Sequence, residues 1–171
     1  MIETSDRAEW RTQLPDTKII EIVDGKATPR TVYHGTHRNF KPEDFDRLAQ
    51  KGRRKGNALD FLGAWWSSNP EAAKIYGPKI LRAKLNIKNP HIIRGKDAWA
   101  KLKMEADKVG SVEAYRGRLI EMGFDGVWLQ GSIVDGIEQD VYVSFINDQI
   151  WPAGPRVDQP AQTAKRRLSL S

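Results

Sequence analysis

His34-Gly35-Thr36, which follows a short apolar run, is the first group of residues that could do chemistry. Glycine has no Cβ, so a ligand can approach its backbone closely. The Thr36 hydroxyl can both donate and accept a hydrogen bond. This strand end could therefore hold a planar carboxamide through its backbone N–H and C=O groups, while His34 binds a sugar hydroxyl. The alternative for His34 is a half-buried histidine that is hydrogen-bonded to a neighbour.

Two aromatic residues, Trp65 and Tyr76, stand eleven positions apart after a Gly63-Ala64 pair. A strand residue and the end of the following short helix can face each other across a slot about one ring thick. Such a slot suits a flat cation, for example the nicotinamide ring of oxidised NAD. The alternative is core packing, which we prefer for Trp66 because it should face away from Trp65.

Several short elements must position these residues, and turn and capping signals delimit them. Asn69 followed by Pro70 predicts the start of a short helix, Ser111 predicts the cap of another, and Asp24-Gly25 predicts a turn. The interval 130–136 contains two glycines and reads as a loop. The predicted strands cover 18–23, 31–34, 80–87, 127–129 and 141–145, and the predicted helices cover 69–76, 96–109 and 111–122.

Many short strands with few helices predict an α+β fold built on a twisted sheet sandwich, not a doubly wound one. We expect one domain over residues 1–153, with 1–16 as a capping segment, and a disordered polar tail over 154–171. The segment 40–45 reads as a loop that closes over a ligand, and the basic segment 48–57 reads as a mobile loop.

The composition excludes several classes of site. The chain of 171 residues has no cysteine and three histidines without metal-ligand spacing, so we expect neither disulfides nor a metal. We expect no membrane span and no secretory signal, and we expect a cytoplasmic location, either in the producing cell or in a host cell that receives the protein. The net charge is +6, with basic clusters at 51–55 and 165–167. These clusters are either nucleic-acid or pyrophosphate contacts or solvated segments.

Taken together, these segments resemble the ADP-ribosyltransferase superfamily, in its branch with a His-Tyr-Glu signature that includes diphtheria toxin and the poly(ADP-ribose) polymerases. The resemblance is strongest to the small bacterial and phage type found in polyvalent proteins. It runs from Thr31 to Trp151. Its motifs are His34-Gly35-Thr36, the 40–45 loop, Gly63-Ala64-Trp65 with Tyr76, the strand end at 85–90, the turn at 123–126 and the segment 142–150.

The resemblance implies an ADP-ribosyltransferase-like fold of two small, mainly antiparallel sheets and a role for each matching residue. His34 would bind ribose hydroxyls, and Gly35 would hold the carboxamide of NAD. Trp65 stands at the position of the signature tyrosine, and Tyr76 stands at that of a second stacking aromatic. The implied reaction is the loss of nicotinamide through an oxocarbenium-like transition state, followed by capture of the ribosyl cation by an acceptor.

The chain departs from this pattern at Val141, where the family has its catalytic glutamate. A valine cannot stabilise a cation, and the nearby acids are Glu138 and Asp140. Since side chains alternate along a strand, Asp140 should face away from Val141. A bulge, or a strand that begins later, could bring Asp140 or Glu138 into the pocket, with Glu138 preferred for its length. The alternative is that both are ordinary solvated carboxylates.

Two functions remain open at this point. The first is an NAD-dependent mono-ADP-ribosyltransferase that modifies a protein, a nucleic acid or a small molecule. The second is a module that binds NAD, ADP-ribose or a macromolecule without turnover. An RNA 2′-phosphotransferase shares the fold and the His-Gly-Thr element, but we cannot assign the converging arginines that it needs.

Overall fold

The computed structural model describes residues 14, 16–37, 41 and 58–153. Its strands are β1 (Ile20–Val23), β2 (Lys26–Pro29), β3 (Val32–Thr36), β4 (Ala64–Ser67), β5 (Lys79–Leu85), β6 (Pro90–Arg94), β7 (Gly126–Val134), β8 (Ile137–Ser144) and β9 (Ile150–Pro152). Its helices are α2 (Pro70–Ala73), α3 (Ala98–Val109) and α4 (Val112–Glu121), with 3₁₀ turns η3 (Ala58–Leu62), η4 (Lys74–Tyr76) and η5 (Asn147–Gln149).

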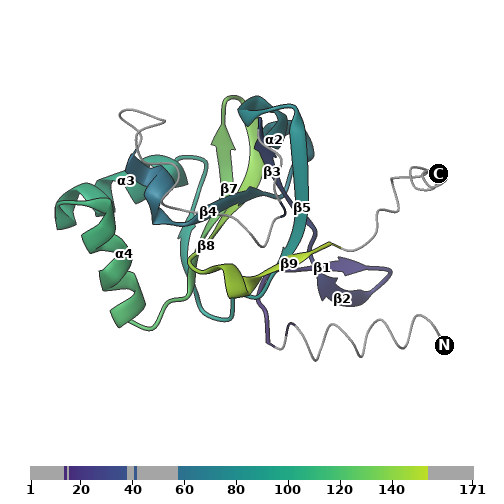
Figure 1. The fold of residues 1–171 in the computed structure, drawn as a ribbon, viewed down its shortest axis with the longest axis horizontal. Coiled ribbons are helices and arrows are strands. Elements are labelled where there is room, and N and C mark those ends of the chain that lie inside the picture. Colours follow the sequence, from purple (N-terminus) through teal and green to yellow (C-terminus); the bar gives the residue numbers. More distant parts are fainter. Residues whose placement is uncertain (1–13, 15, 38–40, 42–57, 154–171) are drawn as a thin grey trace.

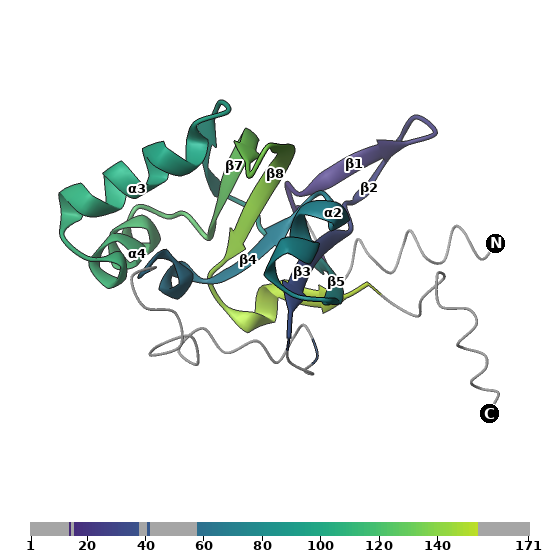
Figure 2. The same cartoon turned by 90° about the horizontal axis from the view of Figure 1, so that it is seen from above.

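The described strands form two sheets, as expected. One is the β1–β2 hairpin, and the other has the order β6-β7-β8-β4-β3-β5-β9. All neighbours in the larger sheet are antiparallel except β6 and β7. Figures 1 and 2 show this sheet with α3 and α4 packed at one end and the β1–β2 hairpin projecting at the other. The α+β prediction, with a few short helices, is therefore confirmed.

Two apolar clusters cover the two faces of the larger sheet. The first joins α3, α4 and η3 to β7 and β8 through residues such as Leu62, Leu102 and Val143. The second lies on the other face and joins β3, β4 and β5 through residues such as Val32, Trp66 and Leu85. Because the clusters take alternate residues of the same strands, Trp65 and Trp66 must lie on opposite faces. We call the face that carries Trp65 the helical face and the face that carries Trp66 the hairpin face.

The predicted helix signals are confirmed. Asn69 caps α2 by accepting a hydrogen bond from the backbone N–H of Glu71 at 2.8 Å, and Pro70 is the first helical residue. Ser111 caps α4 by accepting a bond from the N–H of Ala114 at 3.1 Å. The side-chain hydroxyl or amide oxygen satisfies an N–H group that has no partner within the helix.

The prediction of a loop over 130–136 is wrong, because β7 continues to Val134 and a tight turn at Asp135-Gly136 leads into β8. Both turn residues have positive φ, at 52° and 79°, as a two-residue hairpin requires. Strands β2, β6 and β9 were also missed. The predicted 40–45 loop, the basic loop and the tail all lie outside the described residues, apart from Lys41.

The motif at 123–126 and the segment that ends at Gln149 hold the sheet together. The Asp125 carboxylate accepts hydrogen bonds from the N–H groups of Lys88 and Asn89, both at 2.8 Å. The amide oxygen of Gln149 accepts from the N–H of Phe145 at 2.8 Å, and its amide nitrogen donates to the carbonyl of Asp125 at 2.6 Å. These family-like residues are therefore structural ties between strand ends.

Among the described helices, none is long and apolar enough to cross a membrane.

Candidate functional site

The predicted site lies where β3 and β4 separate. These strands pair through Tyr33 and Ser67 only, whereas β3 pairs with β5 over its whole length. Beyond that pair, the ring nitrogen Nδ1 of His34 lies 2.8 Å from the carbonyl oxygen of Trp65. The His34 side chain therefore contacts the backbone of Trp65 and joins the two strands where the backbone ladder has ended. Alternation from Val32 places its ring on the hairpin face, beside the Trp66 ring.

His34 is held in one protonation state by its surroundings. Burial lowers its pKa, and the bond to the Trp65 carbonyl opposes this shift only in part. A carbonyl oxygen can only accept, so Nδ1 carries the proton and Nε2 of the neutral ring is a hydrogen-bond acceptor. The ring also lies 5.6 Å from that of Trp66. A neutral imidazole with an acceptor nitrogen suits a sugar hydroxyl, which can donate.

Gly35 is required by the close approach of α2. A Cβ atom placed on Gly35 would lie 1.8 Å from the carbonyl oxygen of Ala73 and 3.3 Å from that of Gly77. Only glycine fits here because a helix backbone packs against this position, a reason that the sequence does not reveal. The contact also places α2 and η4 on the helical face of β3. Thr36, the next residue, is buried.

Trp65 and Tyr76 lie on the same side of the sheet, since Trp65 is on the helical face and η4 covers that face of β3. The Trp65 ring is half-buried and donates through Nε1 to the carbonyl of Leu59 at 3.0 Å. It also packs against Trp99 of α3, with ring centroids 4.8 Å apart. Tyr76 is 44% exposed at the end of η4. One aromatic is thus fixed in place, and the other is accessible.

Val141 lies on the helical face. It pairs with Ser67 of β4 and with Leu129 of β7, and it is buried in the first cluster at 6% exposure. The position therefore shares the face of the Trp65 ring and offers only methyl groups.

Asp140 faces the other side and has a structural role. Its carboxylate accepts hydrogen bonds from the N–H of Gly131 at 2.8 Å and from Nε1 of Trp128 at 3.1 Å. The Tyr142 hydroxyl lies 3.5 Å from it, and burial together with this carboxylate raises the pKa of Tyr142. Glu138, two residues earlier on β8, is exposed.

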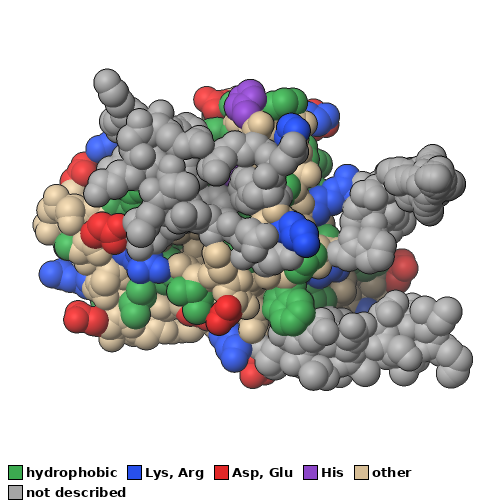
Figure 3. Space-filling model, viewed as in Figure 1, with side chains coloured by type: hydrophobic (Ala, Val, Ile, Leu, Met, Phe, Trp, Pro, Cys, Tyr) green, Lys and Arg blue, Asp and Glu red, His purple; other side chains and the backbone are tan. Residues whose placement is uncertain are grey.

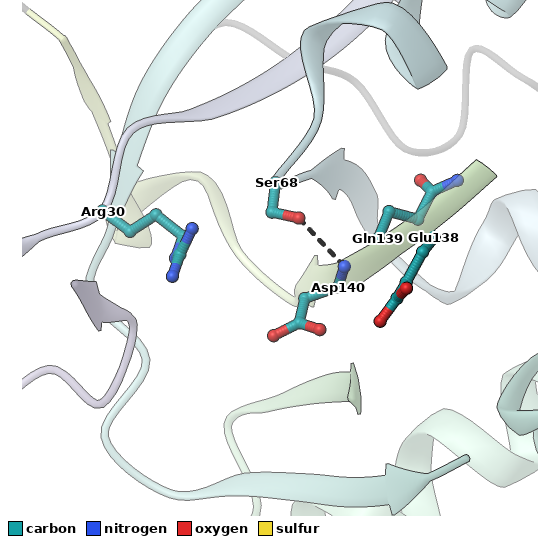
Figure 4. Close-up of a pocket in the computed structure, with 5 residues that line it drawn as sticks. All are labelled: Arg30, Ser68, Glu138, Gln139 and Asp140. Atoms are coloured by element: carbon teal, nitrogen blue, oxygen red, sulfur yellow. Dashed lines mark hydrogen bonds between the residues drawn. The ribbon is translucent and has the colours of Figure 1, made fainter. Parts of the chain in front are cut away.

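The bulge that was expected to turn these acids into the pocket is on the other strand. The register shifts between Leu129 and Ser132 of β7, so the extra residue belongs to β7 and not to β8. Strand β8 also begins at Ile137, before both acids. Its alternation is unbroken, and Figure 4 shows the carboxylates of Glu138 and Asp140 on the side away from Gln139. The expected register change does not occur.

A buried polar pair on the helical face was missed. The Ser67 hydroxyl donates to the amide oxygen of Gln139 at 2.8 Å, and both side chains are buried. By alternation, Gln139 shares the face of Val141. Extending the predicted strand back by two residues would have shown this. No sequence pattern indicated that Trp99 supports the Trp65 ring, because α3 and β4 come together only in the tertiary structure.

The basic clusters and possible metal ligands add no residue to this site in the described part of the chain. On the surface in Figure 3, acidic and basic side chains are interspersed. The basic clusters at 51–55 and 165–167 lie outside the described residues. Among the residues that the structure places, no three His, Asp or Glu side chains are grouped as metal ligands would be.

Comparison with known proteins gives a match over most of the chain. The model of a family described as ADP-ribosyltransferase in polyvalent proteins matches residues 24–154. No curated protein matches the chain. The matched region contains every residue of the candidate site, including His34, Trp65, Tyr76 and Val141. The chain therefore belongs to the family of ADP-ribosyltransferases found in polyvalent proteins.

Proposed function

We propose that this domain binds NAD between α2 and the α3–α4 helices, and that it transfers a single ADP-ribose unit to an acceptor. The observation that carries the proposal is the meeting of His34 and Trp65 at the separation of β3 and β4, in a chain of this family. The nicotinamide ring would lie against Trp65, with Tyr76 closing the stack. His34 would bind a ribose hydroxyl, and Gly35 and Thr36 would hold the carboxamide end.

Cleavage of NAD leaves positive charge on the ribose, and a nearby carboxylate usually stabilises it. The acids that we propose for this role are Glu138 and Asp140. Glu138 is preferred, because the carboxylate of Asp140 already accepts bonds from Trp128 and Gly131. Either acid must reach the helical face from the opposite one, which requires the β7–β8 hairpin end to move.

A second candidate is a module that binds NAD or ADP-ribose without turnover. Burial of Val141 in the apolar cluster favours it, because this position then supplies no charge to the cleft. The first proposal leaves the acceptor open among a protein, a nucleic acid and a small molecule. Nucleic acid is the acceptor that the +6 net charge favours.

Calorimetric titration with NAD and a nicotinamide-release assay separate the two candidates. The parent should bind NAD and, with a cell lysate as the source of acceptors, release nicotinamide and transfer label from labelled NAD. Glu138→Gln should lower the release rate by about 10²–10³. Asp140→Asn should have the smaller effect, and Glu121→Gln on α4 is the matched control.

Binding without release, in the presence of lysate, would support the module and overturn the transferase. Absence of NAD binding would overturn the transferase, and absence of binding to both NAD and ADP-ribose would overturn both candidates. Equal release rates for the parent and both acid variants would show that neither acid is catalytic.

A further inference from the structure

A polar pocket of about 340 Å³ lies on the hairpin face, where the two acids of the proposed reaction lie in this structure. Its lining residues are Arg30, Ser68, Glu138, Gln139 and Asp140. Figure 4 shows Arg30 extending from one side toward Ser68 and Asp140, which come from the other.

The pocket is separate from the proposed NAD cleft. Asp140 and Ser68 lie on the face opposite Trp65 and Val141, because side chains alternate along β4 and β8. Along the strands, Asp140 pairs across from the residue after β4, whereas Trp65 pairs with Val143. The pocket is therefore displaced from the Trp65 ring both through the sheet and along it.

One side of the pocket presents the guanidinium group of Arg30. Its Nε–H is buried and has no hydrogen-bond partner among the described residues. A charged N–H without a partner is costly when buried, so the protein around it does not satisfy this group. A guanidinium group favours a carboxylate, which can accept from two of its N–H groups.

The facing side carries Ser68, whose oxygen accepts from the N–H of Asp140 at 2.9 Å, and two carboxylates. That of Asp140 is held in position by Gly131 and Trp128, so it is oriented before any ligand arrives. Glu138 is exposed at the rim and points the same way. With one guanidinium and two carboxylates, the pocket carries a net negative charge, which favours a ligand cation beside the acids.

We propose that this pocket binds a free α-amino acid. The α-carboxylate would accept hydrogen bonds from Arg30, and the α-ammonium group would donate to Asp140 and Glu138. A peptide has only one of these groups at either end, and a simple phosphate monoester has no cation beside its anion, so the charge pattern favours the free zwitterion. This inference does not depend on NAD binding or on turnover.

The test is calorimetric or saturation-transfer NMR titration of the full chain with free L-amino acids of small, acidic, basic and aromatic types. The matched probes are the N-acetyl derivative and the carboxamide of each amino acid, which remove one charge at a time. We expect at least one free amino acid to bind, and each derivative to bind at least tenfold more weakly. Arg30→Met and Glu138→Gln should each weaken binding at least tenfold, whereas the exposed α4 substitutions Arg118→Met and Glu121→Gln should not.

Thermal unfolding shows whether a variant that fails to bind is still folded. Arg30→Met removes a buried N–H that has no partner, so the variant should fold and melt at least as high as the parent in the absence of ligand. Failure of all free amino acids to bind the parent at millimolar concentration would overturn the proposal. Equal binding of an N-acetyl or carboxamide derivative, or unchanged binding by Arg30→Met, would overturn it as well.

Discussion

At the scale of single residues, His34 and Tyr76 carry the ligand-binding proposal in different ways. His34 is half-buried, has a lowered pKa and is bonded to the Trp65 carbonyl, so its role depends on a fixed tautomer. Tyr76 is accessible at the end of a short 3₁₀ turn, so its role depends on contact with a ligand. The two residues therefore call for different measurements, one of stability against pH and one of affinity.

Replacement of Tyr76 by alanine should weaken NAD binding. Loss of one stacking face costs about 1–2 kcal/mol, which is about 5–30-fold in the dissociation constant. Calorimetric titration of Tyr76→Ala against the parent measures this difference. Ile75→Ala is the matched control, because Ile75 is 51% exposed in the same turn. Equal affinities for the parent and Tyr76→Ala would contradict the stacking arrangement.

Acid should destabilise the protein through His34. Its folded-state pKa lies below the value of 6.5 for the free side chain, so on acidification the unfolded chain takes up this proton first. The free energy of unfolding should therefore fall as the pH drops from 7 through 6.5 toward 5. Urea unfolding at each pH should show a shallower fall for His34→Gln. His37→Gln, at an exposed position, should keep the slope of the parent, and an unchanged slope in His34→Gln would refute the assignment.

At the scale of elements, the contact between α2 and β3 decides how close the candidate aromatics can be. The backbone of α2 approaches Gly35 so closely that no side chain fits between them. The Asn69 cap and Pro70 set where α2 begins, and Gly77 follows η4 with a φ of 157°. These local features place Tyr76 above the same face of the sheet as Trp65.

A methyl group at Gly35 should separate α2 from β3. The Ala73 oxygen belongs to the backbone and cannot rotate away, so Gly35→Ala should cost about 3 kcal/mol or more of unfolding free energy. It should also weaken NAD binding, because Tyr76 moves with α2.

Gly117→Ala on α4 is the matched control. Nothing lies within 4 Å of its added Cβ, so the helix should gain about 0.5–1 kcal/mol. Equal stability of the two variants in urea would disprove the tight contact.

At the scale of the whole molecule, hydrogen bonds between segments far apart in the chain hold the larger sheet and its helices together. Gln149 binds the end of β8 at Phe145 and the turn before β7 at Asp125. Arg116 of α4 donates to the carbonyls of Leu62 and Phe145, at 3.1 and 2.6 Å. These ties hold η3, β7 and β8 against α4, and they therefore support the face on which Trp65 and Val141 lie.

Gln149→Ala should destabilise the whole domain and not only its end. The substitution leaves the buried N–H of Phe145 and the carbonyl of Asp125 without these partners, and each unsatisfied group costs about 1–3 kcal/mol. We expect a loss of about 2–4 kcal/mol in urea unfolding, with all spectroscopic probes changing together. The exposed neighbour Asp148, as Asp148→Ala, should stay within about 0.5 kcal/mol of the parent. A loss confined to the Asp148 variant would contradict the tie.

The sequence by itself determined the features that depend on neighbouring residues. The caps at Asn69 and Ser111, the turn at Asp24-Gly25 and the α+β class follow from local chemistry, and the structure confirms them. The spacing of the His34, Trp65 and Tyr76 motifs likewise indicated the family. Alternation along one strand was enough to predict that Asp140 faces away from Val141.

Only the tertiary structure decided what depends on partners distant in the chain. Strand β6 exists because it pairs with β7, and the end of β7 is a strand because it pairs with β8 across a bulge. The same holds for the site. The His34–Trp65 bond, the Trp99 support, the contact of Gly35 with α2 and the bonds that hold Asp140 each join residues that no local pattern connects. The amino-acid sequence determines which chemical groups are present, whereas the folded sheet determines which partner each group contacts.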